Sequence, residues 1–275
     1  MAVPARAAKN VTVPARLGHR DMRAGSPVRA GTYAFEIGDE VITGWHHHDL
    51  HQLEFAFEGV AQVETATARF LLPPQQAAWI PAGVEHCTTL TRVRTLSVFF
   101  DPAICAGAGD RVRILAAAPV IREMILYARR WPIDRPVSDP AADAFFSALA
   151  HVVREFLDEE APLYLPVSQD PLVSAAMRFT LDHLQDATLR DVCAAVGTSE
   201  RSLRRAFLAG TGMPWRQYQL ESRLLRAMAL LAQPGPNVLT IATTVGFQSM
   251  SGFTRAFRRY TGETPLGYRR RVTLR

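Results

Sequence analysis

The chain has 275 residues, of which 48% are hydrophobic and 21% are charged, so its composition is that of a folded protein and not of a disordered one. No apolar run approaches the ~18 residues that a membrane-spanning helix requires, and residues 1–10 lack the apolar segment of a signal peptide. The three cysteines are far apart and form no Cys-x-x-Cys pair. These features predict a cytoplasmic protein without disulfides and without a membrane partner.

Charge is unevenly distributed along the chain. Residues 170–275 contain 15 arginines and 7 acidic residues, a net charge of +8, whereas residues 1–169 carry a net charge of −3. The formal charge of the whole chain is +5. Because the basic excess is confined to the carboxyl-terminal part, that part is the one expected to bind nucleic acid.

The amino-terminal part changes character near residue 30. Residues 1–30 are rich in Ala, Arg, Pro and Gly without a period, which is typical of a flexible arm. Residues 31–101 alternate short β-branched and aromatic runs with turn residues, which predicts an all-β sandwich or barrel. The expected strands are residues 32–37, 52–57, 61–65, 77–80 and 95–100.

Helical periodicity follows in residues 102–162. Helices are expected over residues 111–131 and 139–159, and Pro140 fits the first turn of the second. Their apolar stripe either packs against the β domain or forms the seam of a homodimer. Residues 163–169 are interpreted as a linker.

Residues 170–275 are predicted to be all-helical. Thr188 followed by Asp191 is a helix-start signal, Gly197 marks a turn, and Ser199 is expected to cap the next helix. The expected helices span residues 171–183, 188–195, 199–209, 214–231, 240–245, 249–260 and 265–271.

This helical part contains an internal repeat. The sequence Arg-Ala-Phe-x-x-x-Thr-Gly occurs at residues 205–212 and again at residues 255–262. Each copy follows a short helix and a glycine turn, so each predicts a helix-turn-helix unit. Two units in tandem predict a partner with two neighbouring segments of groove, a double-stranded DNA operator.

The second helix of each unit is expected to enter the major groove with its outward residues. Arginine can donate two hydrogen bonds to guanine, each such pair giving ~1–3 kcal/mol of discrimination. The first unit presents three arginines, so it is predicted to read bases more stringently than the second. Ser199 and Ser249, at the helix starts, are expected to bring backbone N–H groups to phosphates. The predicted DNA-binding residues are Ser199, Arg201, Arg204, Arg205, Ser249, Met250, Ser251, Thr254, Arg255 and Arg258.

A longer motif surrounds the second copy. It consists of Ile241-Ala242-x-x-Val245-Gly246-Phe247 and of Phe253-x-Arg255-x-Phe257-Arg258-Arg259-x-x-Gly262-x-Thr264-Pro265-x-x-Tyr268-Arg269. With these residues, the segment 167–271 resembles the DNA-binding domain of AraC/XylS-type transcriptional regulators. The resemblance implies seven helices, a long helix bridging the two units, and RNA polymerase as a partner if the protein is an activator. Gly252 departs from a good recognition helix, because Gly weakens a helix by ~1 kcal/mol relative to Ala.

A histidine cluster is the densest polar feature of the β region. His46, His48, Gln52 and Gly59 follow the pattern His-x-His-x3-Gln-x6-Gly, and His86 ends the run Pro-Ala-Gly-Val-Glu-His. These stretches resemble the two motifs of the cupin barrel, which is the usual sensor domain beside this type of DNA-binding domain.

The cupin resemblance leaves two interpretations of the cluster. Metal-binding cupins use positions that match His46, His48 and His86, but here Gln52 stands where a Glu is expected. Three imidazoles can bind Zn, Ni, Fe or Cu, and a glutamine carbonyl is a weak fourth ligand. In the other interpretation, the barrel binds a small organic effector in a polar pocket that Trp45, Gln52 and Trp79 also line.

Together these features predict an α+β multidomain protein: a cupin-like β-barrel with trailing helices, then a tandem helix-turn-helix domain. The expected function is that of a DNA-binding transcription regulator, dimeric and controlled by a small molecule or a metal. The alternative is a metal-dependent cupin enzyme, of dioxygenase or isomerase type, fused to a DNA-binding domain. No paired catalytic carboxylates, nucleophile elbow or phosphate loop supports that alternative in the sequence, so no catalytic residue is assigned.

Overall fold

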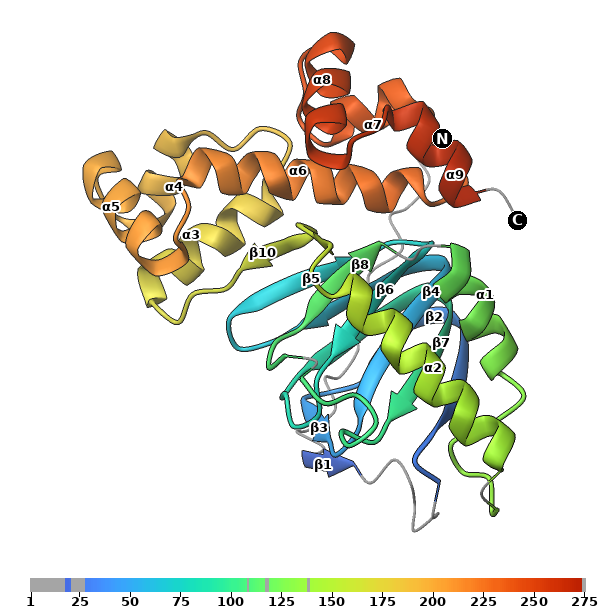
Figure 1. Ribbon diagram of the computed structural model, residues 1–275. Helices are drawn as coiled ribbons and strands as arrows, with labels where there is room; N and C mark the ends of the chain where they lie inside the picture. The colour runs from blue at the N-terminus through green and yellow to red at the C-terminus, as the bar shows by residue number, and fades with distance from the viewer. Residues whose placement is uncertain (1–17, 21–27, 108, 117–118, 138, 274–275) are drawn as a thin grey trace.

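The computed structural model describes residues 18–20, 28–107, 109–116, 119–137 and 139–273. Figure 1 shows a sheet-rich amino-terminal domain below and a helical carboxyl-terminal domain above it. This is the predicted α+β arrangement of two domains. Most of the expected amino-terminal arm, residues 1–17 and 21–27, lies outside the described residues. No helix within those described ranges is both long and apolar enough to cross a membrane.

The central strand of the amino-terminal domain is β4 (His51–Glu64). It pairs antiparallel with β7 (Cys87–Phe100) along one edge. Along the other edge it pairs with β6 (Gln76–Ile80) and then with β5 (Ala68–Leu72). The outer strand β2 (Ala30–Ile42) extends the sheet beyond β7.

Strand β4 unites two strands that the sequence pattern separates at Gly59. The pairing with β7 shifts register around Glu58, and Gly59 has a φ of 75° there. A β-bulge of this kind bends a strand without ending it, and Gly adopts positive φ at little cost. The sequence pattern is therefore interrupted at Gly59, although the hydrogen-bonded strand continues through this residue.

The segment after residue 101 is not entirely helical as expected. Residues Arg113–Ala116 form strand β8, which pairs with β6, whereas the periodicity predicts a helix over residues 111–131. The short strands β9 (Glu160–Ala161) and β10 (Tyr164–Pro166) also join this sheet. An available sheet edge overrides a weak helical pattern, because short apolar runs suit either structure.

Two helices cover one face of the sheet. Helix α1 (Pro119–Ala128) is shorter than predicted, and α2 (Pro140–Phe156) begins where Pro140 predicts, with Asp139 accepting a hydrogen bond from the Ala141 N–H as N-cap. Figure 1 shows both lying against the strands. Fully buried aromatic rings join the layers, since Phe100 of β7 packs edge-on against Phe146 of α2 with 6.2 Å between ring centroids.

The carboxyl-terminal domain contains the seven helices that the family resemblance implies. The capping box predicted at Thr188 is present, because the Thr188 and Asp191 side chains each accept the other's backbone N–H. The helices are α3 (Pro171–Asp182), α4 (Leu189–Val196), α5 (Glu200–Thr211), α6 (Trp215–Leu231), α7 (Val238–Thr244), α8 (Met250–Thr261) and α9 (Pro265–Thr273).

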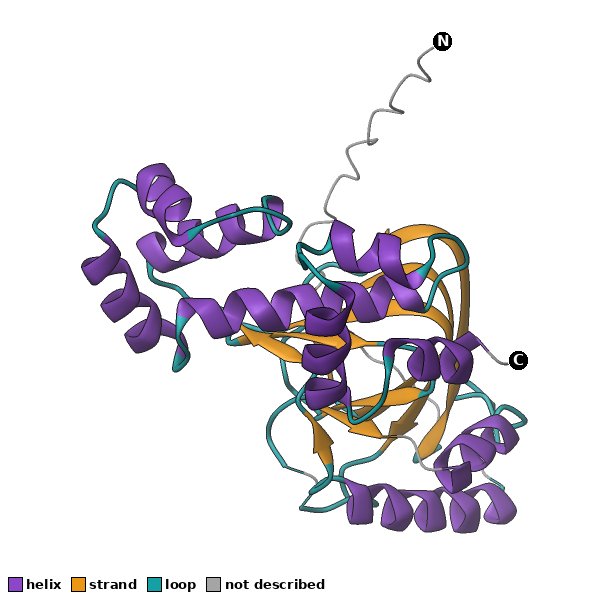
Figure 2. Ribbon diagram, turned by 90° about the horizontal axis from the view of Figure 1, so that it is seen from above, coloured by secondary structure: helices purple, strands orange, loops and turns teal. Residues whose placement is uncertain are grey.

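The two domains meet through the linker segment and helix α6. Figure 2, seen from above, shows α6 lying across the strands between the two groups of helices. The Tyr260 hydroxyl of α8 donates a hydrogen bond to the Pro162 carbonyl at 2.5 Å, and the Gln169 amide donates to the Ala66 carbonyl at 3.3 Å. The second helix-turn-helix unit is thus hydrogen-bonded to the strand-bearing part of the chain.

Candidate DNA interface and effector site

The repeat in the sequence is also a repeat in three dimensions. Phe207 packs against Tyr218 in the first unit with 5.3 Å between ring centroids, and Phe257 packs against Tyr268 in the second at 5.6 Å. The hydroxyl of Thr211 donates to the Phe207 carbonyl at 2.6 Å. In each unit the same Phe and Thr positions therefore close the end of the second helix.

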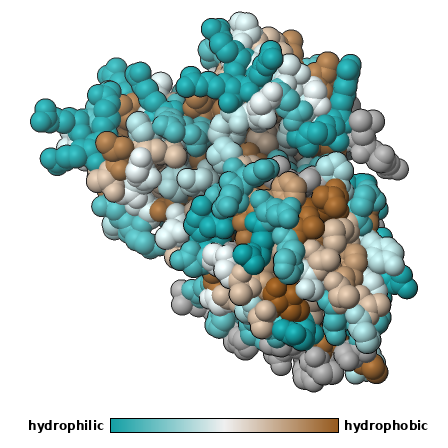
Figure 3. Space-filling model, viewed as in Figure 1, coloured by the Kyte–Doolittle hydropathy of each residue, from teal (hydrophilic) through white to brown (hydrophobic). Residues whose placement is uncertain are grey.

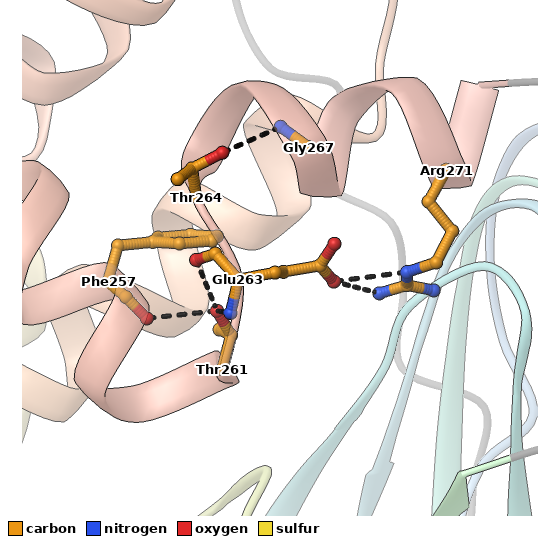
Figure 4. A network of polar contacts seen from close by, with 6 residues as sticks. All are labelled: Phe257, Thr261, Glu263, Thr264, Gly267 and Arg271. Carbon is orange, nitrogen blue, oxygen red and sulfur yellow. Dashed lines mark hydrogen bonds and ion pairs between the residues drawn. The ribbon is translucent and has the colours of Figure 1, made fainter.

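Figure 4 shows the end of the second unit. The Thr261 hydroxyl donates to the Phe257 carbonyl at 2.9 Å. Glu263 accepts two hydrogen bonds from the Arg271 guanidinium, at 3.0 and 2.6 Å, and the Thr264 hydroxyl accepts the Gly267 N–H. Arg271 is therefore held inside its own domain by an ion pair and is a weaker candidate for a phosphate contact.

Helix α5 places the predicted arginines of the first unit outward. Ser199 caps the helix by accepting the Ser202 N–H at 3.2 Å, and Arg201 and Arg205 are exposed. Arg204 is exposed too, but its guanidinium donates to Glu200 at 2.7 Å, one turn earlier on the helix. This intrahelical ion pair was not anticipated, and it separates Arg204 from the other two arginines.

Helix α8 gathers the predicted residues of the second unit on one surface. A shallow hollow is lined by Met250, Ser251, Thr254, Arg255, Arg258 and Arg259. Ser249 caps the helix by accepting the Gly252 N–H at 3.2 Å. A Cβ on residue 252 would lie 3.0 Å from the Ser249 hydroxyl oxygen, so Gly252 leaves room for the cap. The Gly inside the reading helix thus has a local structural reason.

The β domain brings the three predicted metal-binding histidines together. His46 and His86 exchange backbone hydrogen bonds of 3.0 and 2.9 Å, which places the two motifs side by side. The ring centroids of His46, His48 and His86 lie 4.4 to 6.1 Å apart, and all three side chains are buried. His51 is buried as well, with 5.1 Å between its ring centroid and that of Trp79.

The ring nitrogens of these histidines are oriented by backbone carbonyls. The Nδ1 atoms of His46, His48 and His86 lie 2.9, 2.6 and 2.9 Å from the carbonyl oxygens of Gly44, Leu50 and Val84. Each Nδ1 therefore carries the proton that it donates. Metal-binding histidines are held in this way.

Gln52 hydrogen-bonds to the ring of His48. Its Oε1 lies 2.9 Å from the His48 Nε2, and its amide nitrogen donates to Glu54 at 2.6 Å and to Ser97 at 2.9 Å. Burial lowers the pKa of His48, an effect that the hydrogen bonds to Gln52 and Leu50 oppose. Burial raises the pKa of Glu54, opposed by its hydrogen bonds.

These shifts favour the neutral forms of both His48 and Glu54. A neutral His48 that donates from Nδ1 has only a lone pair on Nε2, which suits an amide N–H of Gln52 and not its oxygen. Turning the Gln52 amide over satisfies this demand, and a protonated Glu54 then donates to the amide oxygen.

The residues present do not form a metal site as they stand. Within the described ranges, no group of three or more His, Cys, Asp or Glu side chains is arranged so that it could hold a metal ion. The position where a cupin carboxylate is expected carries the neutral Gln52, which hydrogen-bonds to His48. The three histidines therefore converge without completing a coordination set.

The positions predicted to line an effector pocket differ in their surroundings. Trp79 is fully buried and packs against His51 and Phe100, while Trp45 is half-buried. Gln52 lies inside a polar network with Glu54 and Ser97, two residues that the sequence reasoning missed. Glu54 follows Gln52 at the two-residue spacing of one strand face, and this is the signal that could have found it.

Two family models match the chain. The AraC-like ligand binding domain matches residues 31–166, and a helix-turn-helix domain matches residues 192–271. The chain belongs to the AraC family of transcription regulators. The match to the ligand binding domain precedes the match to the helix-turn-helix domain along the chain.

Two similar proteins, both named as transcriptional regulators, agree with this assignment. The transcriptional regulator NimR of Escherichia coli is 28% identical over 259 residues, which are 93% of this chain and 90% of NimR. The transcriptional activator RhaR of Yersinia pestis is 29% identical over 160 residues, 56% of this chain and 52% of RhaR. The relatives are named as regulators, in agreement with the prediction of a regulator and not an enzyme.

Among solved structures, ToxT of Vibrio cholerae is 10% identical, with a TM-score of 0.38, over 90% of this chain and 99% of ToxT. A likeness at that score adds nothing to the family assignment.

Proposed function

We propose that this AraC-family regulator binds a double-stranded operator by inserting α5 and α8 into two successive segments of the major groove. The observation that carries the proposal is the exposed arginine at the same place in both repeats, Arg205 on α5 and Arg255 on α8. Arginine is the side chain best suited to guanine in the major groove. Ser199 and Ser249 cap the two helices, whose first turns point N–H groups outward for phosphates.

We further propose that a small organic molecule, and not a metal, is the effector of the β domain. The support is the buried network of His48, Gln52, Glu54 and Ser97. Burying polar groups in an apolar interior is costly unless they are hydrogen-bonded. A ligand that offers hydrogen-bonding groups can exchange with members of this network, whereas a metal would meet the amide of Gln52 at the position where the cupin motif has a carboxylate.

The contacts between the domains supply a route for the effector's influence. Tyr260 lies at the end of α8 and hydrogen-bonds to Pro162, in the segment that follows the β domain's helices. A shift of that segment therefore displaces the second reading helix relative to the β domain. An effector that binds the two arrangements unequally changes DNA affinity by that difference.

Helices α1 and α2 are proposed as the seam of a homodimer. On α1, Val120 and Tyr127 are exposed large apolar side chains, and on α2 Phe145 and Val152 are only partly buried. Figure 3 shows apolar side chains gathered over these two helices. If the protein activates transcription, RNA polymerase is the further partner.

Affinity for DNA measured with and without compounds tests the effector site. The probe is a duplex that the purified wild-type chain selects from random DNA, and the compounds are a panel of small carboxylic acids, sugars and aromatic amines. A compound that changes affinity in wild type is expected to lose its effect in Gln52→Leu, while Ser202→Ala, a control in the other domain, keeps it. An equal response in Gln52→Leu would place the effector elsewhere.

A further inference from the structure

The two helix-turn-helix units touch each other directly at the middle of helix α6. The turn between α7 and α8 is formed by Gly246, which is buried and has a φ of 88°. A Cβ at this residue would lie 2.2 Å from the Gln185 carbonyl oxygen, which belongs to the loop before α4 in the first unit. Gly246 is therefore required by its φ and also by the close approach of the other unit.

The corresponding turn of the first unit has no such neighbour. Gly197 also has positive φ, 67°, but a Cβ added there meets none of the described residues within 4 Å. The same turn glycine thus serves only its own backbone in one unit and a contact between units in the other. Gly246 therefore belongs to the contact between the two units. We call this contact, between the Gly246 turn and the 184–185 loop, the joint.

Arg223 closes the joint from helix α6. Its Nε donates to the Leu184 carbonyl at 3.0 Å, and its Nη2 donates to the Gln185 carbonyl at 3.2 Å. The same guanidinium lies 2.9 Å from the place a Cβ would occupy on Gly246. One side chain, midway along the 17-residue helix, therefore hydrogen-bonds to the first unit and lies beside the turn of the second.

Arg223 has no counterpart at the equivalent position of the second unit. Gln219 donates to the Ala187 carbonyl at 2.6 Å, and Arg269, fifty residues later, donates to the Leu231 and Pro236 carbonyls. Gln219 thus ties α6 to the loop before α4, whereas Arg269 ties α9 to the end of α6 and to the loop before α7. The position fifty residues after Arg223 is Thr273, whose hydroxyl donates to the Arg269 carbonyl of its own helix.

We infer that Arg223 is a positioning residue that sets the spacing between the two DNA segments read by α5 and α8. It does so by holding the 184–185 loop of the first unit against the Gly246 turn of the second. This rests on the proposal that both helices read DNA. One base pair shifts a groove segment by ~3.4 Å along the axis and turns it by roughly a tenth of a turn. If the joint is rigid, the two helices cannot both bind when the spacing changes by one base pair. If the joint is loosened, they can.

The test compares the site spacings that full-length variants select from random duplex DNA. Wild type is expected to select two subsites at a single spacing. Arg223→Ala is expected to select additional spacings that differ by one base pair. In direct binding, a one-base-pair insertion between the subsites should weaken wild type at least about 10-fold more than the variant, comparable with the loss caused by a mismatch.

Two further variants separate positioning from folding. Arg223→Lys retains the charge, but its single ammonium lacks the fork that reaches two carbonyls, so it should also relax the spacing. Arg226→Gln changes an exposed arginine on the same helix and should keep the wild-type ratio of affinities for the two spacings. Each ratio compares the affinities of one variant for two spacings, so an equal loss of affinity for both leaves the ratio unchanged. Thermal unfolding measures the stability of each variant.

The inference is overturned if Arg223→Ala and Arg223→Lys keep the single spacing and the affinity ratio of wild type. It is also overturned if Arg226→Gln relaxes the spacing as much as they do. If wild type itself selects only one subsite, the assignment of two readers fails, and the inference falls with it for that separate reason.

Discussion

Glu54 is a carboxyl group buried in the β domain, and its hydrogen-bond partners Gln52 and Ser97 are neutral. Burial raises its pKa above the ordinary value, and His48, reached through Gln52, is the nearest titratable group of the network. A raised pKa means that the folded state resists ionisation. Its stabilising effect is complete below the unfolded-state pKa and is lost as the pH rises through the folded-state pKa.

Glu54→Gln should remove this pH dependence. The new amide can donate to the Gln52 oxygen and accept from Ser97, and no ionisation is required at any pH. We expect the variant to match wild type in acid and to exceed it in free energy of unfolding at neutral and alkaline pH. Urea unfolding from about pH 5 to about pH 9 measures the difference. Parallel curves for the two proteins are the result that contradicts a raised pKa.

The histidine cluster gives a second prediction at the scale of residues. Gln52 bonds to His48 in place of a carboxylate, so the three rings lack a fourth strong ligand. Protein purified without a histidine tag should contain no stoichiometric metal by elemental analysis, and added Zn or Ni should not raise its melting temperature. Gln52→Glu is the informative partner variant, because it restores the carboxylate. Stoichiometric metal in wild type would show that the amide suffices.

At the scale of elements, the sequence predicted those features that residues close to one another in the chain determine. The start of α4 was predictable because Thr188 and Asp191 satisfy one another within four residues. Strand β8 was not, because Arg113–Ala116 is a strand only through its pairing with β6. The histidines could be placed from their motif, but the bond of His48 to Gln52 and the Nδ1 bonds to backbone carbonyls depend on the folded loops around them.

The pairing of Arg204 with Glu200 refines the comparison between the two reading helices. The sequence offers three equivalent arginines on α5, yet only Arg201 and Arg205 lack a hydrogen-bond or ion-pair partner within the described ranges. Arg205→Ala is expected to cost ~1–3 kcal/mol of operator binding and to relax base preference in its subsite. Arg204→Ala should cost less, because binding DNA with Arg204 requires breaking its ion pair.

Competition against duplexes with each base of the subsite replaced measures both effects. Arg255→Ala on α8 should relax the other subsite and leave the first unchanged. Retained base discrimination in Arg205→Ala would contradict the assignment of α5 as a reader. Equal losses for Arg204→Ala and Arg205→Ala would show that the ion pair with Glu200 is not maintained on DNA.

At the scale of the whole molecule, charge and architecture coincide. The net charge of +8 in residues 170–275 lies in the domain that presents α5 and α8, while residues 1–169 are net acidic. An acidic sensor domain is repelled by the phosphate backbone and a basic domain is attracted, so orientation on DNA is set before any base is read. The Tyr260 contact then fixes how far α8 lies from the acidic domain.

This charge separation predicts a steep dependence of operator affinity on salt. The logarithm of the binding constant should fall linearly with the logarithm of salt concentration, because each neutralised phosphate releases counterions. Arg258 and Arg259 line the hollow on α8, so Arg258→Ala and Arg259→Ala should each reduce the slope by about 0.9 where that side chain meets a phosphate.

Arg271→Ala is the matched control for the salt experiment. Arg271 is bound to Glu263 through two hydrogen bonds, so its removal should leave the slope nearly unchanged. Titrations of the selected duplex at several salt concentrations, with a non-specific duplex beside it, separate the phosphate contribution from base readout. A slope that is flat in wild type, or that Arg271→Ala lowers as much as Arg258→Ala does, contradicts the placement of DNA against the outward face of α8.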